Sequence, residues 1–174
     1  MHPLCSPTVF SYVIERCYVR NVPIFLVRHA KAGSRSDWHD DDLVRPLSKK
    51  GWAQSRALAL RLTLHSPVAL LSSPYVRCRQ TLEPLAETLS LDIADHDALT
   101  EGARFEDTLD LLCEVADATV LCSHGDVIPA TIDALIRRGM NVQGEPDWRK
   151  ASTFVLHRVS GEFITAECWP PPGI

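Results

Sequence analysis

PIFLVRHAKAG, residues 23–33, is the stretch of this chain that decides how the remainder is interpreted. Its apolar, β-branched run at 24–27 is typical of a strand buried in a parallel sheet. The run ends by placing Arg28 and His29 side by side, and Lys31 follows two residues later. An Arg-His pair where a strand opens into a loop can gather positive charge around a nucleophile. Whether it does so depends on which other residues the fold brings to the same place.

Strand-like and helix-like segments alternate along the chain after residue 22. Ser48 is the expected cap of the first helix, Pro74 is expected at the first position of the second, and two alternating runs around Ser160-Gly161 indicate a hairpin. The expected strands are 24–27, 68–73, 91–95, 118–123, 152–159 and 162–169, and the expected helices are 48–65, 74–90, 106–116 and one within 124–138. This order predicts an α/β fold, a three-layer α/β/α sandwich with a mostly parallel central sheet.

Length and composition indicate one domain with a sizeable core, since the chain has 174 residues, 45% of them hydrophobic. We assign residues 1–22 to an N-terminal extension and residues 23–174 to the domain. The extension is mildly apolar, but it makes a poor signal peptide and is too short to span a bilayer. The formal net charge of −4 argues against a general nucleic-acid binder. We therefore expect neither nucleic acid nor membrane as a partner.

The six cysteines form no C-x-x-C pair and fit no zinc or haem spacing. They are scattered through apolar segments, which is typical of buried free thiols in a reducing compartment. Cys122 is expected to pack under the end of its strand. The cysteines therefore predict a cytoplasmic protein and give no sign of a metal site.

Reactive residue types follow several of the expected strands. In an α/β sheet, ligands bind beyond the carboxyl ends of the strands, so residues at these positions converge even when they are far apart in sequence. The residues are Arg28 and His29 after the first strand, Arg77 and Arg79 in the first turn of the helix after the second, Glu101 in the loop after a weak strand, and His124 with Gly125 after the strand at 118–123.

Four short motifs, taken in order, resemble the histidine phosphatase superfamily, the phosphoglycerate-mutase-like group. Arg28-His29-Ala30 matches its first motif, and SPYVRCRQT at 73–81 resembles its second, with Cys78 in place of the usual Ala. His124-Gly125 matches the third, and RPLSKKGWAQS at 45–55 resembles the block between the first two. The resemblance extends from Pro23 to the end of the chain.

The short spacing from Glu101 to His124 leaves room for one helix and one strand, which implies a minimal lid. The chain is therefore similar to the compact SixA-type phosphohistidine phosphatases. It also resembles the phosphatase-like domain that lies C-terminal to MutT-type Nudix domains in actinobacteria, through VRCRQTLEPLA at 76–86, HGDVIP at 124–129 and RKASTFVLH at 149–157.

The resemblance implies a phosphatase that works through a covalent phosphohistidine. His29 attacks the phosphorus atom, Arg28 and Arg77 clamp the phosphoryl oxygens, and His124 donates to those oxygens as charge develops. Glu101 is the candidate that protonates the leaving oxygen and then activates water. This chemistry needs no cofactor, and a metal ion would be superfluous. Glu101 could instead complement the dipole of a nearby helix.

Further basic residues leave alternatives open. Lys31, Arg35 and Arg79 are candidate substrate contacts, but they and Arg45 are equally plausible as surface charges. An open site admits either a phosphohistidine side chain of a protein or a small phosphomonoester or nucleotide. A phosphoglycerate-type mutase and a non-catalytic phosphate-binding module are the alternatives to a phosphatase, and the short lid argues against the mutase.

Overall fold

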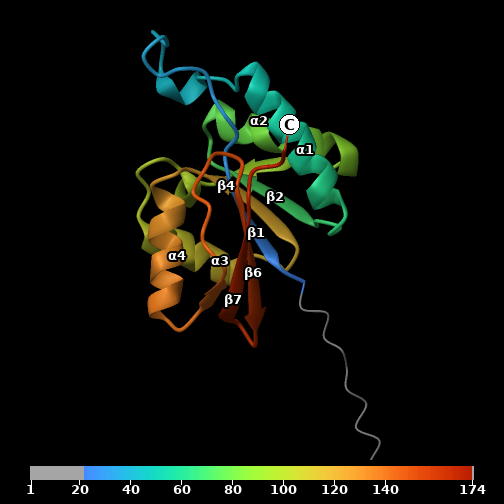
Figure 1. Ribbon diagram of the computed structural model, residues 1–174, viewed down its shortest axis with the longest axis vertical. Coiled ribbons are helices and arrows are strands. Elements are labelled where there is room, and N and C mark those ends of the chain that lie inside the picture. Colours follow the sequence, from blue (N-terminus) through green and yellow to red (C-terminus); the bar gives the residue numbers. More distant parts are fainter. Residues whose placement is uncertain (1–21, 174) are drawn as a thin grey trace, which may run out of the picture.

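A computed structural model describes residues 22–173 and arranges them as a seven-stranded sheet with helices on both faces (Figure 1). All but the last residue of the predicted extension at 1–22 lies outside the described residues. The strands are β1 (Ile24–Arg28), β2 (Ala69–Ser72), β3 (Ile93–Asp95), β4 (Thr119–Ser123), β5 (Asn141–Gln143), β6 (Thr153–Val159) and β7 (Glu162–Trp169).

The strand order is β3-β2-β4-β1-β6-β7-β5, and the first four strands run parallel to one another. Strands β6 and β7 form the antiparallel hairpin expected around Ser160-Gly161. The parallel half brings the carboxyl ends of β1, β2 and β4 to one edge, where Arg28 pairs with Ser123 in register and Ser72 with Cys122. The predicted three-layer α/β fold is thereby confirmed.

The helices cover the sheet in two pairs, which Figure 1 shows on opposite faces. Alternate side chains of β1 point to opposite faces: Ile24 and Leu26 join the core under α3 and α4, whereas Phe25 and Val27 join the core under α1 and α2. All four are fully buried, which explains the continuous apolar run in the sequence. The helices are α1 (Lys49–Thr63), α2 (Val76–Leu89), α3 (Phe105–Glu114) and α4 (Val127–Arg137), with short 3-10 turns at Asp42–Val44 and Asp97–Leu99.

Two local predictions were wrong or incomplete. Helix α2 begins at Val76 and not at Pro74, because the backbone stays extended through Tyr75 and the Ser73 hydroxyl is engaged with a histidine. Strand β5 was not predicted, since it is a three-residue edge strand whose side chains are mostly exposed and carry no hydrophobic pattern. No helix within residues 22–173 is long and apolar enough to cross a membrane.

Candidate active site

The ends of β1 and β4 bring two histidines together at the carboxyl edge of the sheet. The His29 backbone N–H donates to the Ser123 carbonyl over 3.0 Å, and the ring centroids of His29 and His124 lie 5.3 Å apart. A cavity of about 710 Å³ opens there. Its lining includes Arg28, His29, Lys31, Arg35, Arg45, Arg77, Glu101, His124, Gly125, Asp126 and Lys150. Two imidazoles and two guanidiniums that are scattered along the chain thus meet around one hollow.

His29 is buried and held in one tautomer. Its Nδ1 lies 2.7 Å from the Ala30 carbonyl oxygen, and because a carbonyl can only accept, Nδ1 carries the proton. Burial lowers the pKa of His29 well below its ordinary value, and its electrostatic interactions with His124, Arg77 and Lys150 lower it further. The ring is therefore neutral at pH 7, with the lone pair on Nε2.

The polar partners of His124 come from the segment that leads into α2. The Ser73 hydroxyl lies 2.8 Å from Nε2, and the Tyr75 ring packs edge-on at 4.9 Å between centroids. Cys78, which stands where the family usually has Ala, places Sγ 3.4 Å from the same nitrogen. Since a hydroxyl both donates and accepts, Ser73 can hold His124 while Nδ1 faces Arg77, whose Nη2 is 3.4 Å away.

Arg77 is fully buried at the start of α2, yet its guanidinium contacts polar groups on three sides. Nη2 donates to Glu101 Oε2 over 2.5 Å, and Nη1 donates to the Asp42 carbonyl oxygen over 2.8 Å and pairs with its carboxylate over 3.0 Å. The Tyr75 ring lies 4.3 Å from the guanidinium carbon. Nε of Arg77 is buried and has no hydrogen-bond partner among the described residues.

Arg28 lies against the loop that follows β4. A Cβ at Gly125 would come within 2.3 Å of the Arg28 guanidinium, so only glycine admits the arginine at this distance. The guanidinium also donates to the Trp148 carbonyl, and its Nε, like that of Arg77, has no partner among the described residues. Burial lowers the pKa of Arg28, and the Asp126 carboxylate opposes this shift. Arg28 and Arg77 both line the cavity, and planar guanidinium groups are suited to binding the oxygens of an anion.

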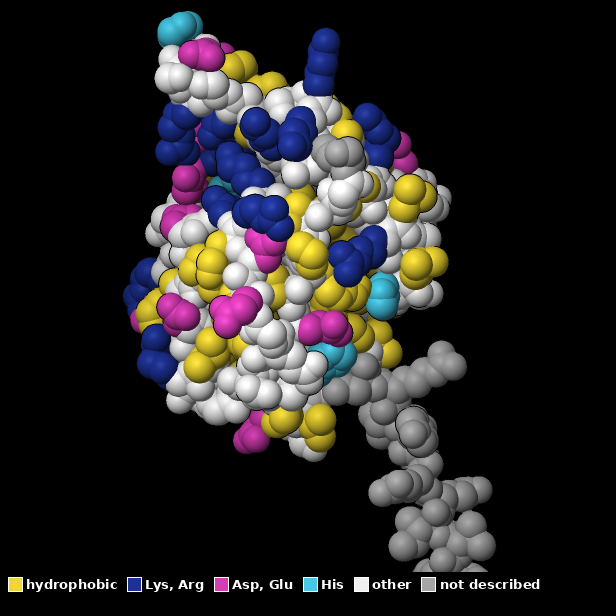
Figure 2. Space-filling model, in the orientation of Figure 1, with side chains coloured by type: hydrophobic (Ala, Val, Ile, Leu, Met, Phe, Trp, Pro, Cys, Tyr) yellow, Lys and Arg dark blue, Asp and Glu magenta, His cyan; other side chains and the backbone are white. Residues whose placement is uncertain are grey.

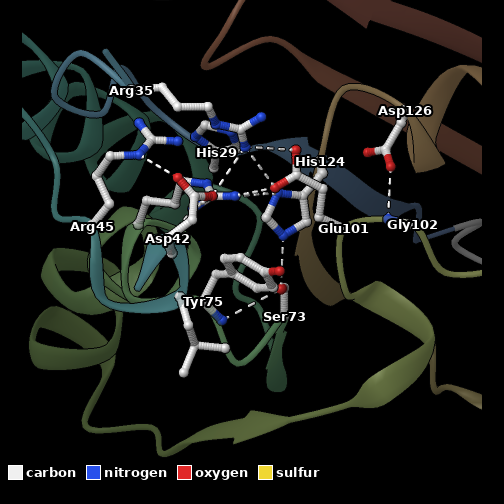
Figure 3. Close-up of polar contacts among 12 residues, drawn as sticks. His29, Arg35, Asp42, Arg45, Ser73, Tyr75, Glu101, Gly102, His124 and Asp126 are labelled. Carbon is white, nitrogen blue, oxygen red and sulfur yellow. Dashed lines mark hydrogen bonds and ion pairs between the residues drawn. The ribbon is translucent and has the colours of Figure 1, made fainter. Parts of the chain in front are cut away.

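A network of ion pairs closes one side of the cavity (Figure 3). Arg35 Nη2 lies 3.0 Å from both Glu101 carboxylate oxygens and 3.0 Å from Asp42 Oδ2. Arg45 Nε donates to Asp42 Oδ1 over 2.7 Å. That hydrogen bond, together with those from Arg35 and the charge of Arg77, holds the pKa of Asp42 well below its usual range. The network ties the loop between β1 and α1 to Arg77 and Glu101.

The structure brings most of the predicted site residues together but leaves Arg79 out. Arg77 and Arg79 are two residues apart on a helix, hence about 200° apart around its axis, and only Arg77 faces the cavity. Arg79 pairs with Asp95 over 2.5 Å and lines no part of the cavity. Of the three candidate substrate contacts, Lys31 and Arg35 line the cavity and Arg79 lies outside it, in the position of the surface charge that was the alternative interpretation.

Sequence reasoning missed several residues of the site. Asp42 and Lys150 were not singled out, Ser73 was seen only as part of a motif, and Arg45, considered equally plausible as a surface charge, is almost fully buried. Arg45 lies in the RPLSKKG block and Lys150 in RKASTFVLH, so the motif matches were the available signal. Within residues 22–173, no group of three or more His, Cys, Asp or Glu side chains is placed to hold a metal ion.

Comparison with known proteins agrees with this geometry. The sequence model that describes the histidine phosphatase superfamily (branch 1) matches residues 24–103. An 8-oxo-(d)GTP phosphatase of Mycolicibacterium smegmatis is 37% identical over 155 residues, which cover 86% of this chain and 48% of that protein. This chain thus spans about half the length of that relative.

Solved structures of SixA proteins share the fold. SixA from Agrobacterium tumefaciens superposes with a TM-score of 0.63 at 27% identity and covers 79% of this chain and 92% of its own. SixA from Nakamurella multipartitia gives a TM-score of 0.62 at 26% identity, covering 87% and 97%.

The chain belongs to the histidine phosphatase superfamily, in accord with the motifs, the fold and the site. Within that superfamily it has the compact build of the SixA type, because α3 and β4 are the helix and the strand between Glu101 and His124.

Proposed function

We propose that this protein is a phosphatase that transfers a phosphoryl group from its substrate to Nε2 of His29 and then to water. The single observation that carries the proposal is the state of His29. Its ring is buried and neutral, its Nδ1–H is held by Ala30, and its free Nε2 belongs to a cavity lined by Arg28, Arg77 and His124. A neutral imidazole in such a cationic site is a competent nucleophile toward phosphorus.

The two arginines would stabilise the charge on the transferring group. A loose phosphoryl transition state spreads charge over three equatorial oxygens, and planar guanidinium forks fit that arrangement. Arg28 and Arg77 both line the cavity, so their guanidinium N–H groups would contact those oxygens. His124 would add a third donor through Nδ1 once the Arg77 N–H that this nitrogen accepts has turned to the phosphoryl group, and the Ser73 hydroxyl, which can donate or accept, would hold Nε2 in place.

Glu101 is the proposed acid and base, and its ion pairs define what must happen first. In the structure its carboxylate forms an ion pair with the Arg77 guanidinium, to which the phosphoryl oxygens are expected to bind. A bound phosphoryl group would displace it, leaving Glu101 at the cavity wall beside Arg35. From there it would protonate a poor leaving oxygen and later take a proton from the attacking water.

The relatives support two proposed classes of substrate. One is a small phosphomonoester or nucleotide, since the Mycolicibacterium smegmatis relative is an 8-oxo-(d)GTP phosphatase. The other is phosphohistidine on a protein, since a SixA structure with the same fold is a protein histidine phosphatase. The absence of a large insertion between Glu101 and His124 favours hydrolysis over a mutase reaction, which would need the phosphohistidine shielded from water.

The direct test compares His29→Ala with His157→Ala, a matched histidine on β6 that lies outside the cavity. We expect His29→Ala to abolish hydrolysis of p-nitrophenyl phosphate while leaving the circular dichroism spectrum unchanged, and His157→Ala to retain turnover. Unchanged turnover in His29→Ala would refute the mechanism. Phosphoryl transfer to an added acceptor in preference to phosphate release would support the mutase instead.

A further inference from the structure

A second cavity, of about 440 Å³, lies beside the candidate active site and shares two residues with it. Lys31 and Lys150 line both cavities, and Lys50 and Arg149 line only the second. We call these four residues the cationic groove. The volume falls within the ordinary range of small-molecule sites. Figure 2 shows Lys and Arg side chains gathered on the upper part of the visible face, toward the end of the molecule where α1 and α2 lie.

The backbone around Lys31 fixes one side of the groove. The Lys31 N–H donates to Gln54 Oε1 over 3.0 Å, and its carbonyl oxygen accepts from both N and Oγ of Ser48 over 2.9 Å. A Cβ at Gly51 would lie 2.0 Å from that carbonyl oxygen, so glycine is required for α1 to pack this closely. The start of α1 therefore fixes the backbone of Lys31 against the helix that carries Lys50, and both lysines line the second cavity.

The other side of the groove is tied to the catalytic strand. The N–H of Ala151, which follows Lys150, donates to the Arg28 carbonyl oxygen over 3.1 Å. The Arg28 N–H in turn donates to the Ser152 carbonyl oxygen over 3.0 Å. These hydrogen bonds fix the backbone next to Lys150 against the strand that carries Arg28. The position of the groove relative to the candidate active site is therefore fixed.

The positive charge of the groove is poorly balanced. Among the described residues, Lys31, Lys50 and Lys150 form no ion pair, and only Arg149 has a carboxylate partner, Asp147. Lys50 also lies in the first turn of α1, a position that favours acidic side chains and here contains none. Burial lowers the pKa of Lys150, as do the charges of Arg28, Arg45, Arg77 and Arg35. Such an arrangement costs stability in the absence of an anion.

We infer that the cationic groove binds the remainder of a condensed phosphate chain whose terminal phosphoryl group reacts at His29. The preferred substrate is then a di- or triphosphate, as in a nucleoside triphosphate, in which one phosphate occupies the active site and the next ones extend past Lys31 and Lys150 toward Lys50 and Arg149. This inference rests on the proposed phosphatase function and selects a substrate class for the same site.

The reaction balances without further reactants. The bond from His29 Nε2 to the terminal phosphorus forms as the bond from that phosphorus to the bridging oxygen breaks. The electron pair stays on the bridging oxygen, and the shortened phosphate chain leaves as an anion beside the groove lysines. Water then cleaves the phosphohistidine, giving orthophosphate and neutral His29. Cleavage at the terminal phosphorus therefore predicts orthophosphate and GDP from GTP, with no pyrophosphate, and equal amounts of orthophosphate and pyrophosphate from inorganic triphosphate.

The ion pairs of Glu101 agree with this substrate class. A terminal phosphate oxygen has a pKa of about 6, so it can leave without being protonated. A condensed phosphate therefore needs no proton from Glu101 in the first step, unlike an alkyl ester. The ion pairs of Glu101 with Arg35 and Arg77 are compatible with a leaving group that takes no proton from it.

The test uses Lys50→Gln and the matched control Lys49→Gln, whose lysine is in the same helical turn and lines neither cavity. Substrates are GTP, inorganic triphosphate, GMP and p-nitrophenyl phosphate, with orthophosphate and pyrophosphate measured separately. We expect wild-type kcat/KM for both triphosphates to exceed that for GMP by about tenfold or more. We expect Lys50→Gln to lower kcat/KM for the triphosphates by about tenfold. The ratio of triphosphate to p-nitrophenyl phosphate turnover should be unchanged in Lys49→Gln.

The outcomes separate the inference from the proposed function. Hydrolysis of p-nitrophenyl phosphate with no preference for triphosphates, equal losses in the two lysine variants, or release of pyrophosphate from GTP would overturn the groove and leave the phosphatase standing. A preference for GTP that inorganic triphosphate does not share would assign the selectivity to the nucleoside, and would likewise overturn it. Failure to hydrolyse any of the four compounds would overturn the phosphatase.

A binding measurement covers the case in which turnover is lost. In the His29→Ala background, titration calorimetry should give a Kd for inorganic triphosphate about tenfold below that for orthophosphate, and adding Lys50→Gln should remove the difference. Equal affinity for the two anions would contradict the groove whether or not the wild-type protein is active.

Discussion

The two walls of the candidate active site are built in different ways. The wall at the sheet edge consists of His29, Arg77 and His124, which are 5%, 1% and 1% exposed, and the ends of β1 and β4 and the start of α2 carry them. The opposite wall consists of Arg35, Asp42 and Glu101, whose side chains are 63%, 31% and 32% exposed and which hold one another by ion pairs. We call them the sheet wall and the loop wall.

The difference indicates which groups stabilise the reacting phosphoryl group and which groups must move to admit it. Groups on the sheet wall are fixed by buried hydrogen bonds, so they can stabilise a reacting phosphoryl group without reorganising. Groups on the loop wall are solvated, and their ion pairs must open to admit an anion. Variants of the sheet wall should therefore have large effects on kcat, whereas variants of Arg35 and Asp42, the loop-wall residues with no proposed proton-transfer role, should have small ones.

The largest effect is expected from Arg77→Lys. Lysine keeps the positive charge but loses the planar fork that contacts Asp42 and Glu101 in the free site and would contact phosphoryl oxygens in the bound one. We expect kcat for p-nitrophenyl phosphate to fall by about 10³-fold. Steady-state kinetics checks this, and a fall below about tenfold would mean that Arg77 has only a structural role.

Gly125→Ala should have the next largest effect, through Arg28. The added Cβ displaces the guanidinium, and a flexible arginine can move away at little cost in stability. We expect kcat/KM to fall by about 10²-fold because the clamp is misplaced, with a melting temperature close to that of the wild type. Neither Gly102→Ala, whose glycine has a positive φ, nor Gly33→Ala, whose glycine lines the cavity, is a neutral control, so the melting temperature serves as the check on folding. Wild-type kinetics in Gly125→Ala would show that Arg28 does not act in its present place.

Ser73→Ala should have a moderate effect, because Ser73 touches His124 and not the substrate. Without the hydroxyl at 2.8 Å, Nε2 loses the hydrogen-bond partner that positions the ring. We expect a fall of about tenfold in kcat with KM unchanged, and partial recovery in Ser73→Thr. If KM rose and kcat stayed constant, Ser73 would be shaping the pocket rather than positioning the histidine.

Arg35→Ala on the loop wall should change little. Its ion pairs with Asp42 and Glu101 are exposed, and such pairs contribute little net free energy. We expect kcat/KM to change by less than about threefold. A loss as large as that of Gly125→Ala would place Arg35 on the reacting phosphoryl group and remove the distinction between the two walls.

The smallest expected change is in the charge of the His29 ring on mild acidification. Its pKa is lowered, so the neutral form that carries the lone pair persists as the pH falls through the ordinary value of about 6.5. Histidine-selective NMR of the free protein should show no protonation of His29 between about pH 7.5 and about pH 6. Titration of this ring near or above 6.5 would mean that the site does not hold it neutral.

Much of the sheet wall could be predicted from the sequence. The apolar run before Arg28 and His29 and the buried strand before His124 give strong local signals, and parallel strands place their carboxyl ends at one edge. The start of α2 and the direction of its arginines were harder to predict. Proline, here Pro74, is a common first residue of a helix, and the sequence alone made Arg79 a candidate for the site together with Arg77. The engaged Ser73 hydroxyl and the helical period decide both points, and neither can be read from composition.

The loop wall and the cationic groove could be predicted only in part. Lys31 and Arg35 were proposed because they follow the first motif, but Asp42 and Lys150 lie in irregular segments without periodicity. Their positions depend on long-range contacts, such as Arg77 with Asp42 and Ala151 with the backbone of Arg28. Contacts of this kind leave no mark in a single sequence apart from a family motif.

Everything proposed here depends on a covalent bond between His29 and phosphorus. Protein mixed with [γ-³²P]GTP or with a labelled aryl phosphate and quenched rapidly in base should carry label that is stable to alkali and lost in acid, and peptide mapping should locate it on His29. The same experiment on His29→Ala should give no label. Label on a different side chain, or rapid turnover with no labelled enzyme at any quench time, would contradict the account.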